Sequence, residues 1–229
     1  MDTKLVYMEF MDRLADTARV ESMEPTDGKT AVVLDRTIFY PQGGGQRYDT
    51  GTMTCEGKRF RVTEVRYVDG SVKHYGTFEG MPFAVGDTVS CAVDGARRLL
   101  NSRLHSAGHV LDMAQKNLGI GWVPGKGYHF PDGPYVEYEG DLGGIAVEKL
   151  RQDLEAECAA IIATDVTTKV RFTEANGPGG KPGRVVMYGD FSVPCGGTHV
   201  ANLGAIGKLT IRSIKPKSGK IRVGYEIGD

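Results

Sequence analysis

The chain has 229 residues, which is enough for one large domain or two modest ones with cores of their own. Apolar residues make up 40% and charged residues 25%, which is ordinary for a globular protein. The formal net charge of -1 excludes a protein that binds polyanions through an overall positive charge, so binding of a nucleic acid would need a local basic patch. No apolar run approaches the roughly 20 residues that span a bilayer, and Asp2, Lys4 and Glu9 argue against a signal peptide. We therefore expect a cytoplasmic protein with no membrane partner.

The first part of the chain is expected to consist of strands. Short runs rich in β-branched or aromatic residues lie at 5–10, 29–35, 58–67, 71–77 and 87–93. Turn signals separate these runs, and the pair Asp69 and Gly70 predicts a hairpin. Several short strands at this spacing favour a small barrel or a sandwich.

The pattern changes at Asp94, a residue type that caps helices. Apolar residues recur at helical spacing over 96–117, and Gly119 is expected to end that helix. A second helix is expected at 145–163, followed by strands at 166–173, 184–188, 208–214 and 221–227. We predict an α+β fold with an all-β domain at 1–93 and an α+β domain at 94–229.

Two pairs of residues, each four apart, carry the strongest chemical signal. His105 and His109 would lie one turn apart on one face of the first helix, where two imidazoles can share a metal ion. Cys195 and His199 enclose Gly196 and Gly197, a segment expected to bend. The alternatives are two polar residues on a helix face and a buried thiol beside a surface histidine.

Together the four residues are of the types that suit Zn²⁺, which accepts nitrogen and sulfur ligands in tetrahedral geometry. Four protein ligands normally make a closed structural site, whereas a catalytic site keeps a position for water or substrate. The ligand count leaves both roles open. The remaining cysteines are expected to be free buried thiols: Cys55, Cys91 and Cys158.

Two further segments are candidates for binding. Gly43, Gly44 and Gly45 precede Gln46, and such a run indicates close approach of the backbone to a ligand or to another segment; the alternative is a flexible surface turn. The C-terminal strands carry a cluster without acidic residues, which could bind a phosphate backbone or could be a solvated hairpin. Its members are Lys208, Arg212, Lys215, Lys217, Lys220 and Arg222.

The paired metal motifs resemble the metal signature of the editing domain of alanyl-tRNA synthetase. The stretches 39–46 and 184–200 are similar to the same family. Because 229 residues leave no room for an aminoacylation domain with its ATP site, the chain resembles the longer free-standing alanyl-tRNA editing proteins called AlaX.

The resemblance implies a small β-barrel followed by an α+β domain shared with threonyl-tRNA synthetase. It implies Zn²⁺ held by His105, His109, Cys195 and His199, and hydrolysis of tRNA(Ala) mischarged with serine or glycine. It also implies that the 43–46 segment faces the pocket. The chain departs from the family where Gly125 replaces a glutamine and where Gly108, inside the first helix, costs about 1 kcal/mol relative to alanine.

An editing pocket must read the serine hydroxyl through buried polar groups, which alanine would leave unpaired. The candidates are Ser106, Gln46 and Thr198, with Gln46, Thr198 and Asp190 as candidate catalytic residues and Asp190 as a group that orients a metal histidine or a water. Two rival functions are a zinc-stabilised tRNA-binding module without hydrolysis and a zinc hydrolase for a small ester. Either a monomer or a homodimer is compatible with the sequence.

Overall fold

The computed structural model describes residues 2–174 and 183–228, except for the side chain of Lys217. The chain forms two compact units, Met1–Gly43 with Arg47–Leu99, and Gly44–Gln46 with Leu100–Asp229. The division falls inside the first helix, six residues beyond the expected boundary, and it groups most of the glycine-rich segment with the second unit.

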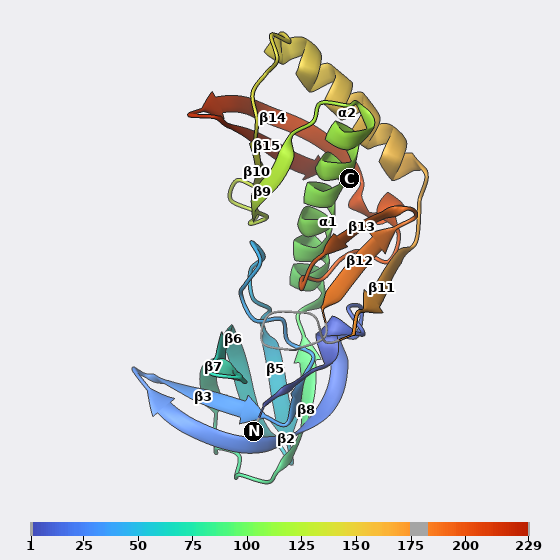
Figure 1. The fold of residues 1–229 in the computed structure, drawn as a ribbon. Helices are drawn as coiled ribbons and strands as arrows, with labels where there is room; N and C mark the ends of the chain where they lie inside the picture. The colour runs from blue at the N-terminus through green and yellow to red at the C-terminus, as the bar shows by residue number, and fades with distance from the viewer. Residues whose placement is uncertain (1, 175–182, 229) are drawn as a thin grey trace. The chain divides into compact units, whose positions relative to one another are not determined.

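The first unit is a closed six-stranded barrel, which confirms the expected small β-barrel (Figure 1). Residues that alternate along its strands fill its core, which is the pattern of strands with one buried face. Asp69 and Gly70 both have positive φ angles, 48° and 84°, as the predicted hairpin requires. In barrel order the strands are β2 (Ala15–Thr26), β3 (Lys29–Leu34), β7 (Ser71–Glu79), β6 (Lys58–Val68), β5 (Gly51–Cys55) and β8 (Thr88–Val93).

The predicted strand at 5–10 is wrong. Only β1 (Lys4–Leu5) is extended, where it pairs in parallel with β4 (Arg36–Thr37), and a 3₁₀ turn follows at Val6–Met8. Strand β2, the longest of the barrel, was not predicted. Its burial pattern is irregular and it contains Pro25, so its sequence lacks the alternation that marks a strand.

Helix α1 (Gly95–Asn117) begins in the first unit and continues into the second, which also holds α2 (Val147–Ala163), and both helices lie close to the predicted ranges. The backbone N–H of Arg97 donates to Asp94 Oδ1 at 3.1 Å, which confirms the cap. Gly119, at φ 66°, ends α1 in a left-handed conformation with the N–H of Ile120 donating to the carbonyl of Gln115 at 3.0 Å, as expected.

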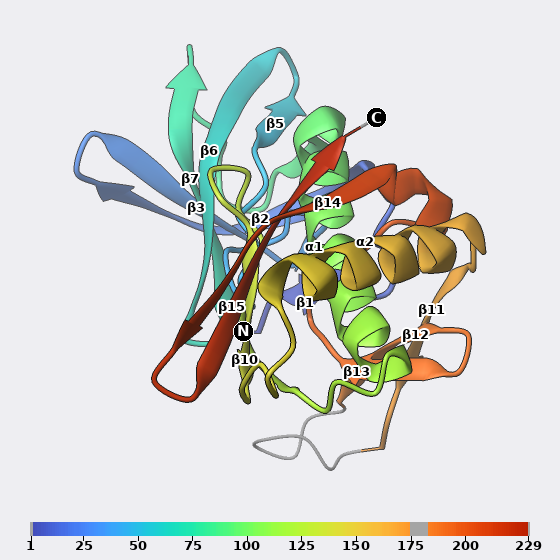
Figure 2. The same ribbon diagram turned by 90° about the horizontal axis from the view of Figure 1, so that it is seen from above.

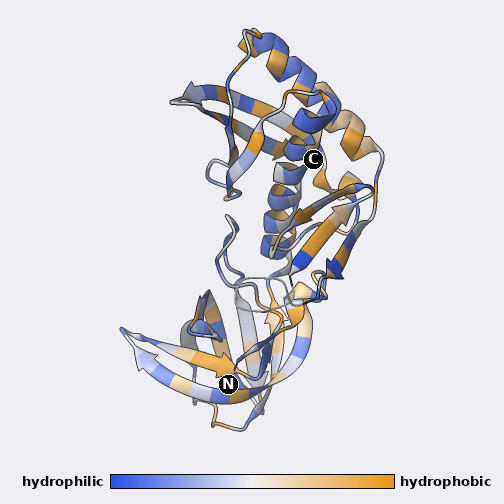
Figure 3. Ribbon diagram, viewed as in Figure 1, coloured by the Kyte–Doolittle hydropathy of each residue, from blue (hydrophilic) through white to orange (hydrophobic). Residues whose placement is uncertain are grey.

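Two antiparallel sheets accompany the helices, and together they make the predicted α+β fold (Figures 1 and 2). The core joins α1 and α2 to one face of the larger sheet. Hydrophobic and hydrophilic residues alternate along β14 and β15, so the opposite face of that sheet is polar (Figure 3). The larger sheet has the order β14 (Lys208–Lys217), β15 (Lys220–Gly228), β10 (Tyr135–Glu139) and β9 (Val123–Tyr128), and the smaller one β11 (Thr168–Phe172), β12 (Arg184–Tyr188) and β13 (Phe191–Pro194).

None of the helices in the described part of the chain has the length and apolar content that crossing a bilayer requires.

Candidate functional site

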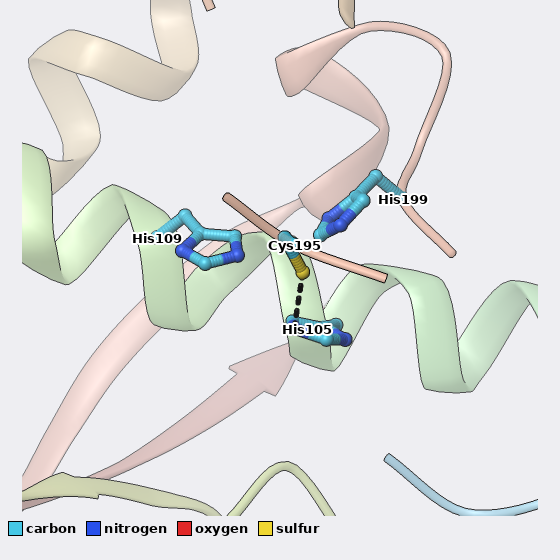
Figure 4. Close-up of side chains that lie close together, drawn as sticks. All are labelled: His105, His109, Cys195 and His199. Atoms are coloured by element: carbon cyan, nitrogen blue, oxygen red, sulfur yellow. Dashed lines mark hydrogen bonds between the residues drawn. The ribbon is translucent and has the colours of Figure 1, made fainter. Parts of the chain in front are cut away.

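Four side chains of the second unit meet where α1 passes the segment that follows β13 (Figure 4). One nitrogen of each imidazole and the Cys195 sulfur lie within 4.8 Å of one another. The rings of His105 and His109 are 5.2 Å apart, as expected for one helical turn, and Cys195 Sγ lies 3.3 Å from His105 Nε2. The structure therefore brings together the tetrad His105, His109, Cys195 and His199, whose members come from positions up to 94 residues apart.

Each imidazole of this tetrad is held through its Nδ1 atom. His105 Nδ1 donates to Gln46 Oε1 at 2.8 Å, and His109 Nδ1 donates to Asp112 Oδ2 at 3.2 Å. Tyr188 Oη lies 2.9 Å from His199 Nδ1. Because an amide oxygen and a carboxylate only accept, the proton of His105 and His109 lies on Nδ1 and Nε2 turns to the centre, as in metal sites.

The Nε2 atoms of His109 and His199 are buried and have no hydrogen-bond partner in the described chain. An unsatisfied buried polar atom costs about 1–3 kcal/mol, so two such atoms at one centre need an explanation. A metal ion bound there would satisfy both. The donor set of three imidazole nitrogens and one thiolate is one that Zn²⁺ accepts, so the residues present fit that ion.

Two imidazoles of the tetrad favour their neutral form, whereas His109 and Cys195 favour their charged forms. Burial and the neighbouring imidazoles hold the pKa values of His105 and His199 well below the usual range. Burial opposes the charge on His109 and Cys195, yet Asp112 and the sulfur of Cys195 raise the pKa of His109 to about 9, and His109 lowers the pKa of the Cys195 thiol. Neutral imidazole and thiolate are the forms that bind Zn²⁺, so a bound ion would displace the second proton of His109.

Three predicted substrate-reading groups are fully buried and already paired within the protein. Gln46 Oε1 accepts from the backbone N–H of Thr198 at 3.0 Å as well as from His105, and Gln46 Nε2 donates to Thr198 Oγ1 at 2.8 Å. Ser102 Oγ lies 2.8 Å from the same Oγ1. Ser106 Oγ accepts from the N–H of Val200 at 3.1 Å. These contacts tie the three groups to the tetrad and to the segment around it, and their role toward a substrate stays a prediction.

The glycine-rich segment approaches another segment of the backbone. A side chain at Gly45, whose φ is 76°, would place its Cβ 2.3 Å from the carbonyl oxygen of Gly127. The carbonyl of Gly45 accepts from the N–H of His129 at 2.8 Å. Gly44 also has a positive φ, 51°, whereas Gly43 belongs to the first unit, where its carbonyl accepts from the Tyr40 hydroxyl at 2.9 Å. Gly45 therefore needs to be glycine for a structural reason.

Asp190 is exposed in the turn between β12 and β13. The Nδ1 atoms of the three tetrad histidines are held by Gln46, Asp112 and Tyr188, and the expectation that Asp190 orients a metal histidine or a water stays a prediction. The geometry offers Asp190 no place in the tetrad.

The basic residues of the hairpin are exposed, but part of their charge is offset. Glu137 forms ion pairs with Lys220 at 3.0 Å and Arg222 at 3.3 Å, and Arg212 lies 3.6 Å from Glu226. Lys208 and Lys215 are exposed on β14, and the side chain of Lys217 lies outside the described residues.

The sequence interpretation missed His129, the ring that lies over the tetrad. It stacks on His105 with centroids 4.5 Å apart, and burial lowers its pKa to about 3. The Tyr225 hydroxyl donates to the carbonyl of Leu104 at 2.7 Å and therefore accepts from His129 Nδ1 at 2.7 Å. A Cβ at Gly108 or Gly127 would lie 2.3 Å from this ring, so both glycines make room for it.

The sequence contained signals for two residues near the tetrad that the interpretation did not use. Asp112 follows His109 by three positions and so shares its helix face. Tyr188 lies inside the stretch that resembles the editing domain. Nothing near His129 in the sequence pointed to its partners, because Tyr225 is 96 residues away.

Family models match two parts of the chain. Residues 3–97 match the model for class II (A) tRNA synthetases, and residues 184–223, which include Cys195 and His199, match the second additional domain of threonyl and alanyl tRNA synthetases.

Curated relatives cover most of the chain. Alanine–tRNA ligase of Korarchaeum cryptofilum is 33% identical over 99% of this chain and 26% of the relative. The corresponding enzymes of Methanothrix thermoacetophila and Caulobacter sp. are both 32% identical, over 87% and 90% of this chain and 23% and 26% of the relative. The chain spans about a quarter of the length of these relatives. With the tetrad geometry and both family models, these matches identify the chain as an AlaX-like protein related to the editing domain of alanyl-tRNA synthetase.

Proposed function

We propose that this protein is a zinc-dependent hydrolase that removes a wrongly attached amino acid from tRNA(Ala), with Ser-tRNA(Ala) as the main substrate and Gly-tRNA(Ala) as the second. The relation to the alanyl-tRNA synthetase editing domain supports a role in tRNA editing. The observation that carries the hydrolase proposal is the convergence of three imidazoles and one thiol within 4.8 Å.

The need for such an activity follows from the energetics of recognition. A synthetase pocket for alanine cannot strongly exclude serine or glycine, because one small group changes binding by only about 1–3 kcal/mol. A second site that hydrolyses the wrong product supplies the missing discrimination.

The residues of this chain would hold the metal ligands in place and leave room for the ester bond of a charged tRNA. A bound Zn²⁺ supplies a Lewis acid that polarises a carbonyl and acidifies water. Gln46, Asp112 and Tyr188 keep the imidazoles oriented, which avoids reorganisation during the reaction. Gly196 is exposed and a Cβ there would meet nothing within 4 Å, so the segment beside Cys195 leaves open space for the substrate to approach.

One observation favours a second function. The tetrad already provides the four ligands of a closed tetrahedral site, which is typical of structural zinc. On that reading the protein holds charged tRNA on a zinc-stabilised scaffold and performs no chemistry.

A deacylation assay separates the two functions. Purified protein is incubated with Ser-, Gly- and Ala-tRNA(Ala), with and without a chelator. We expect release of serine, sparing of alanine and loss of activity with the chelator. The double variant His109→Ala, Cys195→Ala should be inactive, and Cys55→Ala, which removes a half-buried thiol of the barrel, serves as the matched control.

Binding of charged tRNA without turnover by the wild type would favour the binding module. Full activity of the double variant would contradict a role for the tetrad in hydrolysis.

A further inference from the structure

The larger sheet of the second unit has one face that is not buried in the core. Val136, Tyr138 and Tyr225 point into the core shared with α1 and α2. Tyr135, which is half-buried, and Arg222, which is exposed, lie on the opposite face of the sheet. The hairpin of β14 and β15 extends beyond α2 on this sheet (Figure 2).

Four planar groups form a ladder on this polar face. The Tyr128 ring lies 4.5 Å from Phe130 on one side and 5.3 Å from Tyr135 on the other, nearly parallel to the latter at 15°. The Arg222 guanidinium lies 4.2 Å from the Tyr135 ring centroid. We call Phe130, Tyr128, Tyr135 and Arg222 the planar ladder. The Arg222 guanidinium lies at the end of this row that is next to Tyr135.

A hollow of about 370 Å³ lies at the Arg222 end, large enough for a small ligand group. It is lined by Glu137, Lys215, Ser218, Lys220 and Arg222. Glu137 shares its charge between Lys220 and Arg222, while Lys215 takes part in no ion pair of the described chain. The hollow therefore combines a planar cation with excess positive charge and hydrogen-bonding groups.

The other end of the ladder lies at the edge strand β9, on the opposite face of the sheet from His129. Tyr128 and Phe130 flank His129 in the chain, and His129 stacks on His105. An unpaired RNA strand whose end enters the tetrad would pass around the β9 edge of the sheet, where Tyr128 and Phe130 begin the row of planar groups that leads toward the charged hollow.

We propose that the planar ladder and its hollow bind the unpaired 3′ nucleotides of the tRNA, with a base stacked on the Arg222 guanidinium and phosphates at Lys215 and Lys220. This inference rests on the proposed function, since it names a contact surface for the same substrate. Unpaired bases stack on aromatic rings and guanidinium planes, whereas the base faces of a duplex are already stacked on neighbouring base pairs. The surface therefore favours single-stranded RNA over double-stranded RNA.

The test compares two RNA hairpins, one with a four-nucleotide 3′ tail and one blunt, by fluorescence anisotropy with the full chain. We expect the wild type to prefer the tailed hairpin. Tyr135→Leu should weaken binding of the tail by about 5- to 100-fold and leave binding of the blunt hairpin unchanged. Arg222→Lys keeps the charge and removes the plane, so it should reduce the same preference without changing the salt dependence.

Two charge variants complete the experiment. Lys215→Gln should weaken both hairpins and lower the slope of log affinity against log salt by about 1. Lys169→Gln, which removes an exposed lysine of β11 in the smaller sheet, should change neither affinity nor preference. Circular dichroism confirms that each variant is folded.

Equal binding of the tailed and blunt hairpins by the wild type would overturn the inference, and so would unchanged preference in Tyr135→Leu and Arg222→Lys. The proposed function fails separately, if the wild type does not deacylate Ser-tRNA(Ala) while it still prefers the tailed hairpin.

Discussion

The barrel and the second unit both bury histidines, but they use them differently. In the barrel, His74 has both ring nitrogens engaged, Nε2 with Thr37 Oγ1 at 2.8 Å and Nδ1 with the carbonyl of Val32 at 2.9 Å. In the tetrad, His109 and His199 have Nδ1 engaged while Nε2 lacks a partner. A buried histidine with two partners completes a core, whereas one with a single partner has a nitrogen left for a ligand.

The cysteines repeat this contrast. Burial raises the pKa of Cys91, in the barrel, to about 12, so that thiol stays protonated. Cys195 is half-buried, and although burial acts to raise its pKa, His109, the backbone N–H of Gly197 and Arg184 together lower it. Local partners, more than burial itself, separate a core thiol from a metal ligand.

The largest effect is expected from removing a member of the tetrad. His199→Ala should weaken zinc binding by more than about 100-fold, beyond the loss typical of an outer partner, because one of four ligands disappears. His74→Gln should retain one zinc per chain. Metal content of the purified variants, measured by mass spectrometry, checks both, and zinc retained by His199→Ala at wild-type affinity would break the comparison.

The second effect is the pH dependence of the barrel. Burial lowers the pKa of His74 from 6.5 to about 4, so the unfolded chain takes up the proton first as the pH falls. The stability contribution is complete above pH 6.5 and is lost as the pH falls through about 4, by roughly 3 kcal/mol. Amide hydrogen exchange of β3 and β7 should show this loss, and His74→Gln should flatten it. Equal pH slopes in the two proteins would contradict the assignment.

A third prediction concerns a glycine whose missing side chain makes room for the His129 ring. Gly108→Ala gains about 1 kcal/mol of helix propensity, but its Cβ would lie 2.3 Å from the His129 ring, and such overpacking costs about 1–3 kcal/mol. We expect net destabilisation, which becomes a gain when His129→Ala is also present. Urea unfolding followed by Trp122 fluorescence, with a chelator present, checks the reversal of sign.

Gly76 of the barrel provides the contrasting case. A Cβ there would lie 1.9 Å from the carbonyl oxygen of Arg61, so no truncation of a side chain can relieve Gly76→Ala. If Gly108→Ala destabilised equally with and without His129, the ring would not be the reason for that glycine.

A smaller effect is expected from the outer partner of His109. Asp112→Asn keeps an oxygen that accepts from His109 Nδ1 but removes the charge, so we expect a 10- to 100-fold loss of zinc affinity, about the range for outer partners. Competition with a chelating dye measures it. An affinity equal to that of the wild type would show that Asp112 does not support the tetrad.

The smallest effect is expected from Asp190→Asn. Its carboxylate is exposed in a turn, so zinc affinity should be unchanged and the free energy of unfolding should change by less than about 0.5 kcal/mol. A loss of zinc affinity as large as that of Asp112→Asn would restore the interpretation made from sequence.

Secondary structure was predictable where the signal was local. Helix α1 has apolar residues at helical spacing, a capping Asp94 and a terminal Gly119, all within the segment itself. Strand β9 contains Pro124, Gly125 and Gly127 and has no strand pattern. It is extended because it pairs with β10, and such pairing cannot be read from β9 alone.

The candidate site shows the same difference between local signals and contacts between distant segments. The sequence by itself marked the two halves of the tetrad, because each half has two suitable side chains four positions apart, and that spacing acts through local geometry. That the two halves meet was expected from the resemblance and is decided by the tertiary structure. Only the tertiary structure decided what surrounds them. Gln46 is 59 residues from His105 and 152 from Thr198, and His129 is 96 from Tyr225. Hydrogen bonds across such separations depend on how the chain folds back on itself, so no pattern along the sequence encodes them.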